Sequence, residues 1–260
     1  MNDSPRFRSF VALGDSFTEG MSDALPDGTY QGWADRLARR LAAGQVDFRY
    51  ANLAVRGKLI GQIAREQVPV AAAMNADLVT LVGGLNDVLR PRCDLRAVFE
   101  RLAWSVERLA PTCSCLVLMR SPARRGPVLE RYRNRLTLLY RFIDDLAARH
   151  DALVVDVYAS RTLGDSRLWA DDRLHLTGEG HRRVTEAVWQ ALGFPATFDW
   201  DAPLPAAIPP HWLTRLGADA RFAREHLLPW VGRRLTGRSS GDGRLPKRPD
   251  LSPLAWEDSR

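Results

Sequence analysis

The chain has 260 residues, of which 45% are hydrophobic, and this is enough apolar material for an extensive core. Its formal charge of +6 rests on arginine, because lysine occurs only at Lys58 and Lys247. The basic residues are spread along the whole length and match no nucleic-acid-binding motif. We therefore expect a globular protein without a nucleic-acid role.

The amino terminus, MNDSPRFRSF, contains no apolar signal region, and no segment approaches the roughly 20 apolar residues that cross a bilayer. We therefore expect a cytoplasmic protein without a transmembrane segment. Cys93, Cys113 and Cys115 form no even disulfide framework, and the spacing CSC is too short for a CxxC redox or zinc motif. Free thiols are the expectation.

Short apolar runs alternate with longer segments of helical periodicity as far as Pro195, which predicts βαβ units around a parallel sheet. In chain order, the predicted strands are Phe7 to Leu13, Phe48 to Leu53, Leu78 to Val82, Leu116 to Met119 and Leu153 to Val157.

Helices are predicted where apolar residues recur every three or four positions. These residues are Trp33, Leu37 and Leu41, then Phe99, Leu102, Val106 and Leu109, then Val128, Tyr132, Leu136, Leu139, Ile143 and Leu146. A last helix is expected to begin at a Thr177 cap, to carry Val184, Val188 and Leu192, and to end at Gly193.

The composition changes after Pro195, since the rest of the chain holds eight of the 16 prolines and four of the eight tryptophans. We interpret residues 1–195 as a catalytic domain and residues 196–260 as an extension that packs on it. Helical spacing predicts one amphipathic helix from near Pro210 to Pro229. The Pro-rich and Gly-rich segment from Thr236 to Asp250 is expected to be an exposed strap. Burial of Trp200, Trp212 and Trp230 would let the extension partly cover the site.

Two separated motifs carry the chemistry. The segment GDSFTEG places Ser16 after the first predicted strand, at the carboxyl edge where open α/β sheets form their sites. In DRLH, Asp172 and His175 lie three positions apart, so the carboxylate can orient the imidazole. A second interpretation of the first motif is a helix cap, because Ser16 and Glu19 have capping-box spacing.

Two loops after the next predicted strands offer hydrogen-bond donors. Gly57 ends NLAVRG and permits close backbone approach to a ligand, while Asn86 in GGLND offers amide N–H groups without a charge. Taken singly, each also fits an ordinary turn or cap residue.

Taken in order, GDSFTEG, AVRGK, GLND and DRLH followed by LTGEGH resemble the blocks of the SGNH hydrolase family, also called GDSL-type esterases or lipases. The resemblance covers residues 8 to about 192. It implies a flavodoxin-like three-layer α/β/α sandwich with a five-stranded parallel sheet, no metal or organic cofactor, and hydrolysis of esters or sugar-linked acyl groups. Two mild departures are Phe17 in place of leucine and the charged Lys58 after Gly57.

By position, the resemblance makes Ser16 the nucleophile, His175 the general base and Asp172 its orienting partner. The N–H groups of Ser16 and Gly57, together with the Asn86 side chain, would form the oxyanion hole. Asp171 competes with Asp172 for the carboxylate role but lacks the DxxH spacing.

The substrate is less defined by the sequence. Met21, Leu25 and Trp169 are candidates to line an acyl pocket, although each also fits fold packing. Arg120, which begins RSPARRG, could bind an anionic ester or lipid headgroup, or could belong to a solvated loop. An ester of short or medium acyl chain is the leading substrate, and an acetylated carbohydrate is the alternative.

Two other classes of function stay open. One is an inactive scaffold with this fold, and the other is peripheral membrane contact through the helix around Leu213 to Trp230. A literal GxSxG at Gly237 to Gly241 lacks the strand and helix that a nucleophile elbow needs. His181 lies six residues beyond His175, which puts the two on different helix faces, and we expect it to satisfy a local hydrogen bond rather than bind metal.

Overall fold

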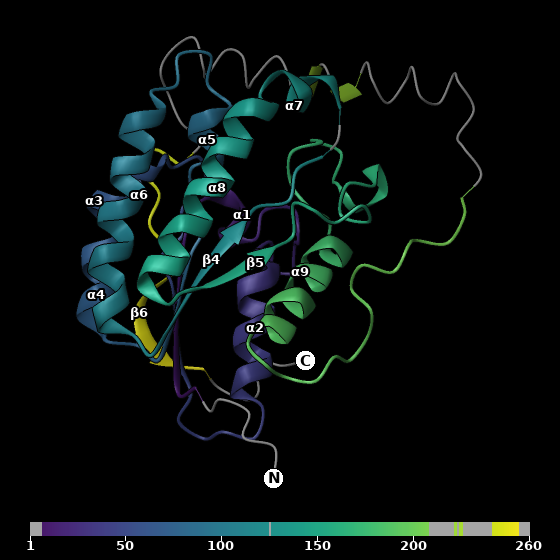
Figure 1. Cartoon of the computed structure of the whole chain (residues 1–260). Coiled ribbons are helices and arrows are strands. Elements are labelled where there is room, and N and C mark those ends of the chain that lie inside the picture. The colour runs from purple at the N-terminus through teal and green to yellow at the C-terminus, as the bar shows by residue number, and fades with distance from the viewer. Residues whose placement is uncertain (1–6, 125, 208–220, 223, 226–240, 255–260) are drawn as a thin grey trace.

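A central sheet in the strand order β5-β4-β3-β1-β2-β6 organises the computed structural model (Figure 1). The structure describes residues 7–124, 126–207, 221–222, 224–225 and 241–254. Five of the strands run parallel to one another: β1 (Ser9–Leu13), β2 (Arg49–Asn52), β3 (Leu78–Leu81), β4 (Cys115–Arg120) and β5 (Leu153–Asp156). Each end lies within one residue of the predicted strand, except that β1 begins two residues after the predicted Phe7.

The sixth strand corrects the expected five-stranded parallel sheet. β6 (Arg248–Pro253) pairs antiparallel with β2 at the sheet edge. β6 begins inside the segment from Thr236 to Asp250, which was predicted to be an exposed strap, and continues past its end. Pro249 and Pro253 hide it from sequence patterns, because proline is tolerated in a strand only at an edge or an end. The α/β sandwich itself is as predicted.

Helices fill the connections between the strands. They are α1 (Ser16–Glu19), α2 (Gly32–Ala42), α3 (Ile60–Glu66), α4 (Val68–Met74), α5 (Leu85–Val88), α6 (Leu95–Leu109), α7 (Pro127–Arg131), α8 (Arg133–His150) and α9 (Gly178–Ala191). The Thr177 cap is confirmed, since its side chain accepts a hydrogen bond from Gly180 N–H. Within the described chain, no helix is long and apolar enough to cross a membrane.

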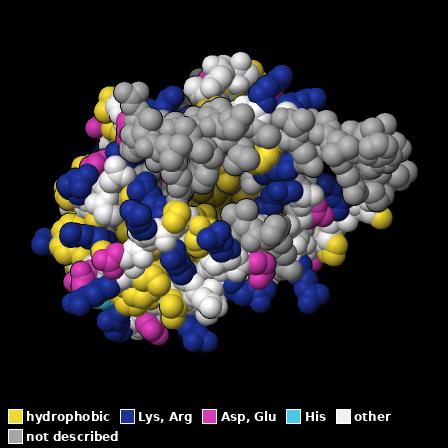
Figure 2. Space-filling model, turned by 90° about the horizontal axis from the view of Figure 1, so that it is seen from above, with side chains coloured by type: hydrophobic (Ala, Val, Ile, Leu, Met, Phe, Trp, Pro, Cys, Tyr) yellow, Lys and Arg dark blue, Asp and Glu magenta, His cyan; other side chains and the backbone are white. Residues whose placement is uncertain are grey.

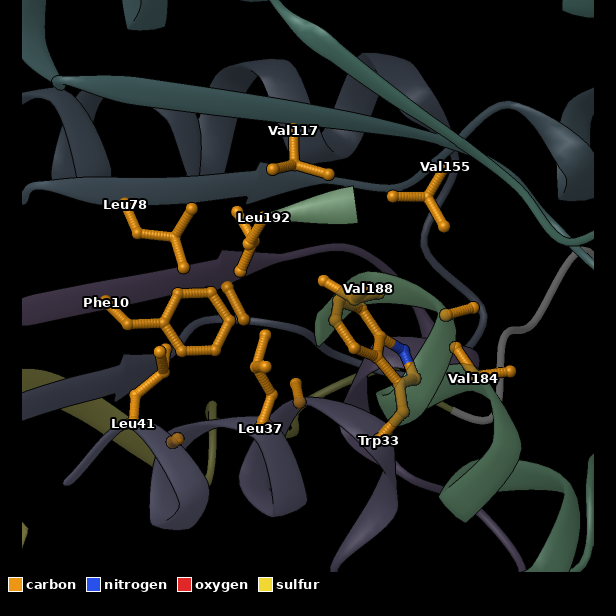
Figure 3. Packing of buried hydrophobic residues seen from close by; sticks show 14 of the residues in the cluster. Phe10, Trp33, Leu37, Leu41, Leu78, Val117, Val155, Val184, Val188 and Leu192 are labelled. Carbon is orange, nitrogen blue, oxygen red and sulfur yellow. The ribbon is translucent and has the colours of Figure 1, made fainter. Parts of the chain in front are cut away.

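The two faces of the sheet bury separate apolar clusters. Along β1, Phe10 and Ala12 belong to the cluster beneath α2 and α9, whereas Val11 and Leu13 belong to the cluster beneath α3, α4, α6 and α8. This alternation is the period of two that a strand imposes on its side chains. Figure 1 shows the two helical layers, and Figure 3 shows the first cluster, where Trp33 and Leu37 of α2 lie near Phe10.

The first residues after α9 are tied to the domain by polar contacts. Arg183 Nη1 donates to the carbonyls of Trp200 and Ala202, both at 2.8 Å. Trp200 and Leu204 are partly buried against the cluster beneath α2 and α9. The predicted helix from Pro210 to Pro229, with Trp212 and Trp230, lies largely outside the described residues, so its form stays a prediction.

Leu37 provides a test of the core beneath α2. Leu37→Ala removes a fully buried side chain and should lower the free energy of unfolding by about 2–5 kcal/mol, because the lost apolar burial adds to the cost of a cavity. Urea denaturation measures the change. Val46→Ala, at a side chain that is 94% exposed, is the control and should stay within about 0.5 kcal/mol of the parent.

Candidate active site

The turn that carries Ser16 is held rigidly at the carboxyl end of β1. A Cβ atom on Gly14 would lie 2.5 Å from Thr18 Oγ1 and 2.8 Å from the Val82 carbonyl, so only glycine fits there. The buried side chain of Gln67 then binds both polar groups of Gly14, accepting from its N–H at 2.9 Å and donating to its carbonyl at 2.9 Å. Gln67, which lies between α3 and α4, therefore fixes the backbone just before Ser16.

Asp15, and not Ser16, caps helix α1. The Asp15 carboxylate accepts from Phe17 N–H at 3.1 Å, and Ser16 is the first residue of the helix. Glu19 closes no capping box, because its carboxylate binds Arg56 instead. The capping interpretation of Ser16 is therefore wrong. Within the described residues the Ser16 hydroxyl makes no hydrogen bond, which leaves it available for chemistry.

Three hydrogen-bond donors gather around this turn. The N–H groups of Ser16 and Gly57 have no acceptor in the described part of the chain. Gly57 has a φ of 73°, a left-handed conformation that favours glycine. Asn86 Nδ2 donates to Asp15 Oδ2 at 2.9 Å and to the Lys58 carbonyl at 3.2 Å, so it lies between the Ser16 turn and the Gly57 loop.

The DRLH loop holds an imidazole and a carboxylate in contact. Asp172 Oδ2 lies 2.6 Å from His175 Nδ1, and Asp172 Oδ1 accepts from the N–H groups of Leu174 and His175 at 2.9 and 3.0 Å. Arg173 adopts a left-handed φ of 57°, which turns both N–H groups toward the carboxylate. Burial alone would raise the pKa of Asp172, but the contact with His175 and the two N–H groups lower it to about 2. The structure therefore favours a charged carboxylate beside His175.

The DRLH loop and the Ser16 turn are neighbours. Ser22 Oγ, shortly after α1, donates to Asp172 Oδ2 at 3.4 Å. Burial raises the pKa of Asp15, and the hydrogen bond from Phe17 N–H and the proximity of His175 partly offset that rise. No hydrogen bond joins the Ser16 hydroxyl to His175 in the described residues. Such bonds are often long without substrate and tighten in the reactive complex.

The buried Asp15 and the half-buried Asp87 lie next to Ser16 and Asn86 in the chain. Burial raises the pKa of Asp15 to about 6, and burial likewise raises that of Asp87 to about 6. Asp87 Oδ2 accepts from Ile60 N–H at 3.0 Å, which joins the loop after β3 to the loop after β2. The Asp87 side chain, adjacent to Asn86, thus links the Asn86 segment to the start of α3, three residues after Gly57.

His181 makes hydrogen bonds, as predicted, but they are with residues distant in the chain rather than local, and His175 lies before α9 rather than on it. His181 Nδ1 accepts from Trp33 N–H at 3.2 Å, and its Nε2 lies 3.2 Å from the Met21 carbonyl, so the neutral ring donates there. Complete burial lowers its pKa to about 4. The described residues contain no group of three or more histidine, cysteine or acidic side chains that could hold a metal ion.

The remaining predicted substrate residues, Met21, Leu25, Arg120 and Trp169, all make contacts within the fold. Arg120 binds Asp144 and Asp156, an arrangement that favours a structural role on β4. Trp169 is partly buried, and its Nε1 donates to the Leu163 carbonyl at 2.8 Å. The Met21 carbonyl contacts His181, and Leu25 is half-buried in a turn closed by Thr29. Their roles toward substrate stay predictions.

The site depends on residues that the motifs did not reveal. Gln67 makes two hydrogen bonds to Gly14, 53 positions away in the chain, which no periodic pattern signals. Asp87 is the last residue of GLND, but the motif did not signal its hydrogen bond with Ile60 N–H. Asp15 stands inside the GDSFTEG motif, so its adjacency to Ser16 was the available signal. On the part of the face that Figure 2 colours, Lys and Arg side chains are dispersed among apolar ones rather than gathered in a single patch.

Asp87 makes stability depend on pH. Its carboxyl has a pKa raised from 3.8 to about 6 in the fold, so its stabilising contribution is complete below pH 4 and is lost as the pH rises through 6. Asp87→Asn keeps an oxygen for Ile60 N–H but does not ionise. The Tm of the variant relative to the parent should therefore rise between pH 4 and 7. Asp145→Asn, at an exposed carboxylate, is the control, and its Tm difference from the parent should not change with pH. A Tm difference of Asp87→Asn that is equally independent of pH would contradict the assignment.

Comparison with known proteins places this geometry in a family. A model described as the GDSL-like Lipase/Acylhydrolase family matches residues 12–183. The comparison with curated proteins finds no match. An acetylxylan esterase from Geobacillus stearothermophilus is similar in structure, with 18% identity and a TM-score of 0.60 over 76% of this chain and 97% of its own.

A second solved structure, an α/β hydrolase enzyme from the metagenome of Lake Arreo, Spain, has 24% identity and a TM-score of 0.59 over 72% of this chain and 95% of its own. At these identities the two structures show the shared fold alone. The family match spans well over half of the sequence and contains Ser16, Gly57, Asn86, Asp172 and His175. The chain belongs to the GDSL-like Lipase/Acylhydrolase family.

Proposed function

We propose that this chain, a carboxylic ester hydrolase by its family, cleaves esters of short or medium acyl chains through an acyl-enzyme on Ser16. The observation that carries the proposal is the pairing of an unengaged Ser16 hydroxyl with a neighbouring imidazole that Asp172 orients at 2.6 Å. That arrangement follows the logic of a serine triad, in which the carboxylate fixes the tautomer of the base.

In the first half-reaction, His175 Nε2 removes the proton of the Ser16 hydroxyl while the oxygen attacks the ester carbonyl. Asp172 remains ionised, because its pKa is held at about 2, and it stabilises the imidazolium that forms. The imidazolium then protonates the leaving alcohol. Water attacks the acyl-enzyme with the same histidine as base, which releases the acid and regenerates Ser16.

The negative charge on the carbonyl oxygen would be stabilised by the Ser16 and Gly57 N–H groups, which have no acceptor among the described residues. Asn86 supplies the third donor. Its contact with Asp15 at 2.9 Å fixes the amide plane, and its contact with the Lys58 carbonyl at 3.2 Å is the one that an oxyanion would share or replace.

A carbohydrate O-acetyl esterase is the second candidate. It is favoured by the similarity to an acetylxylan esterase, which reaches a TM-score of 0.60. The same residues would perform both reactions, so only the leaving alcohol separates the two candidates. Profiling turnover over esters of increasing acyl length beside acetylated sugars distinguishes them.

For the rest of the chain, we propose that residues 196–260 pack on the catalytic domain and partly cover the site. The contact between Arg173 of the DRLH loop and the ring of Phe222, at 4.4 Å from the ring centroid, supports this proposal. Peripheral membrane contact through Leu213 to Trp230 is tested by vesicle co-sedimentation with and without residues 196–260, and equal binding would remove it.

Ser16→Ala tests the nucleophile. Fluorophosphonate labelling and ester turnover should both be lost, because the proposed acyl-enzyme forms on the Ser16 oxygen. Ser114→Ala, at an exposed serine after η1 (Ala110–Thr112), is the control and should label like the parent. Persistent esterase activity in Ser16→Ala would overturn the assignment, and a parent chain that never labels would favour an inactive scaffold.

Asn86→Ala tests the oxyanion hole. Loss of one donor should lower kcat by about 10²- to 10³-fold, while KM changes little, because the donor acts mainly on charge that develops in the transition state. Steady-state kinetics on a neutral ester, with the Tm recorded in parallel, measures the effect. A parent-like kcat would exclude the Asn86 amide from the hole.

A further inference from the structure

We infer that the carboxyl-terminal strap, defined as residues 241–254, positions the Ser16 helix and the Gly57 loop for catalysis, and that Lys247 is its positioning residue. The inference goes beyond the proposed reaction, although its turnover measurements rest on it. The strap lies outside the segment that matches the family, which ends at residue 183.

β6 anchors the strap beside the site. Its register pairs Arg49 with Pro253 and Asn52 with Arg248, and Leu254 N–H donates to the Phe48 carbonyl at 2.9 Å. Because Asn52 is the last residue of β2, its partner Arg248 places the preceding Lys247 at the carboxyl edge of the sheet. This is the edge at which the Ser16 turn begins.

The ammonium group of Lys247 is surrounded by oxygen atoms from the end of α1 and from the start of α2. Nζ lies 2.6 Å from the Glu19 carbonyl, 3.0 and 2.9 Å from the carbonyls of Tyr30 and Gln31, and 2.6 Å from Asp35 Oδ2. Glu19 ends α1, and the other three acceptors lie just before or within the first turn of α2. One cation therefore fixes the end of α1 against the start of α2.

Helix α1 needs such support. It has only four residues, and a single helical turn is unstable by itself because nucleation is unfavourable and its last carbonyls have no intrahelical partner. The Asp15 cap satisfies its first turn. Lys247 satisfies the Glu19 carbonyl at the other end, so the orientation of Ser16 depends on both.

Glu19 also links the end of α1 to the Gly57 loop. Its carboxylate accepts from Arg56 N–H at 2.6 Å and from Arg56 Nε at 2.9 Å, and Arg56 is the residue before Gly57. Gly241 of the strap also packs against Arg56, since a Cβ on Gly241 would come within 2.0 Å of the Arg56 carbonyl oxygen. The strap therefore holds the Gly57 loop directly through Gly241 and indirectly through Lys247 and Glu19.

Replacement of Lys247 tests the inference in the full-length chain. Lys247→Met keeps the length of the side chain but removes the cation. Turnover per active site, titrated with fluorophosphonate, should fall by about 10- to 100-fold with little change in KM, because small misplacement of catalytic groups can cost about 10² in rate. Arg96→Met removes a cation whose side chain is 88% exposed on α6 and should leave turnover unchanged.

Hydrogen exchange gives a readout that does not require ester turnover. In Lys247→Met, amide exchange should accelerate in the peptides spanning 14–21 and 53–60 relative to Arg96→Met. If the parent hydrolyses no ester but the exchange changes as expected, the proposed function fails while the role of the strap stands. If turnover per site and exchange both match the parent, the inference is overturned.

Chemical rescue separates positioning from general stability. Lys247→Cys treated with bromoethylamine restores an ammonium at the lysine position. Cys113 and Cys115 should react slowly, since burial raises the pKa of both thiols to about 11, and the treated parent controls for all native cysteines. Alkylation should restore most of the lost turnover per site. Recovery of Tm without recovery of turnover would contradict a positioning role.

Gly241→Ala provides a second variant in case Lys247 variants do not fold. The substitution removes no hydrogen-bonding group, yet the added Cβ must push the strap and the Arg56 carbonyl apart. We expect turnover per site to fall by about 10-fold, since the displaced carbonyl shifts the adjacent Gly57 donor. Turnover within twofold of the parent, in a folded variant, would overturn the contact between the strap and the Gly57 loop.

Discussion

The site depends on one geometric constraint, the parallel pairing of β1 with β2 on one side and β3 on the other. Parallel strands end at a common edge, so the loops after these three strands meet although they are far apart in the chain. The first loop presents Ser16, the second Gly57 and the third Asn86. Asp15 and Asp87 then join the loops through hydrogen bonds that only this adjacency permits.

Much of this arrangement could be predicted because it leaves a local trace in the sequence. The parallel strands are short apolar runs, and the helices show apolar stripes such as Trp33, Leu37 and Leu41 on α2. DRLH encodes its own geometry, since two residues three apart in one loop meet directly at 2.6 Å. Local patterns therefore predicted both the sheet edge and the contact between the Asp172 carboxylate and the His175 imidazole.

What could not be predicted rests on long-range polar contacts. Gln67 reaches Gly14 across 53 positions and Lys247 reaches Glu19 across 228, and neither leaves a periodic signal. The competition between Asp15 and Ser16 to cap α1 was equally invisible, because both residue types are good caps. It is decided by tertiary contacts, since Asn86 holds Asp15 while Glu19 turns away to Arg56.

β6 also changes what the molecule presents to other chains. An uncovered β2 would expose a row of backbone N–H and C=O groups, which is a template for pairing with another molecule. β6 occupies that row with a strand containing Pro249 and Pro253, which have no N–H to donate, and it carries charged side chains at Arg248 and Asp250. The new sheet edge is thus poorly suited to strand addition, so β6 disfavours edge-to-edge pairing between molecules.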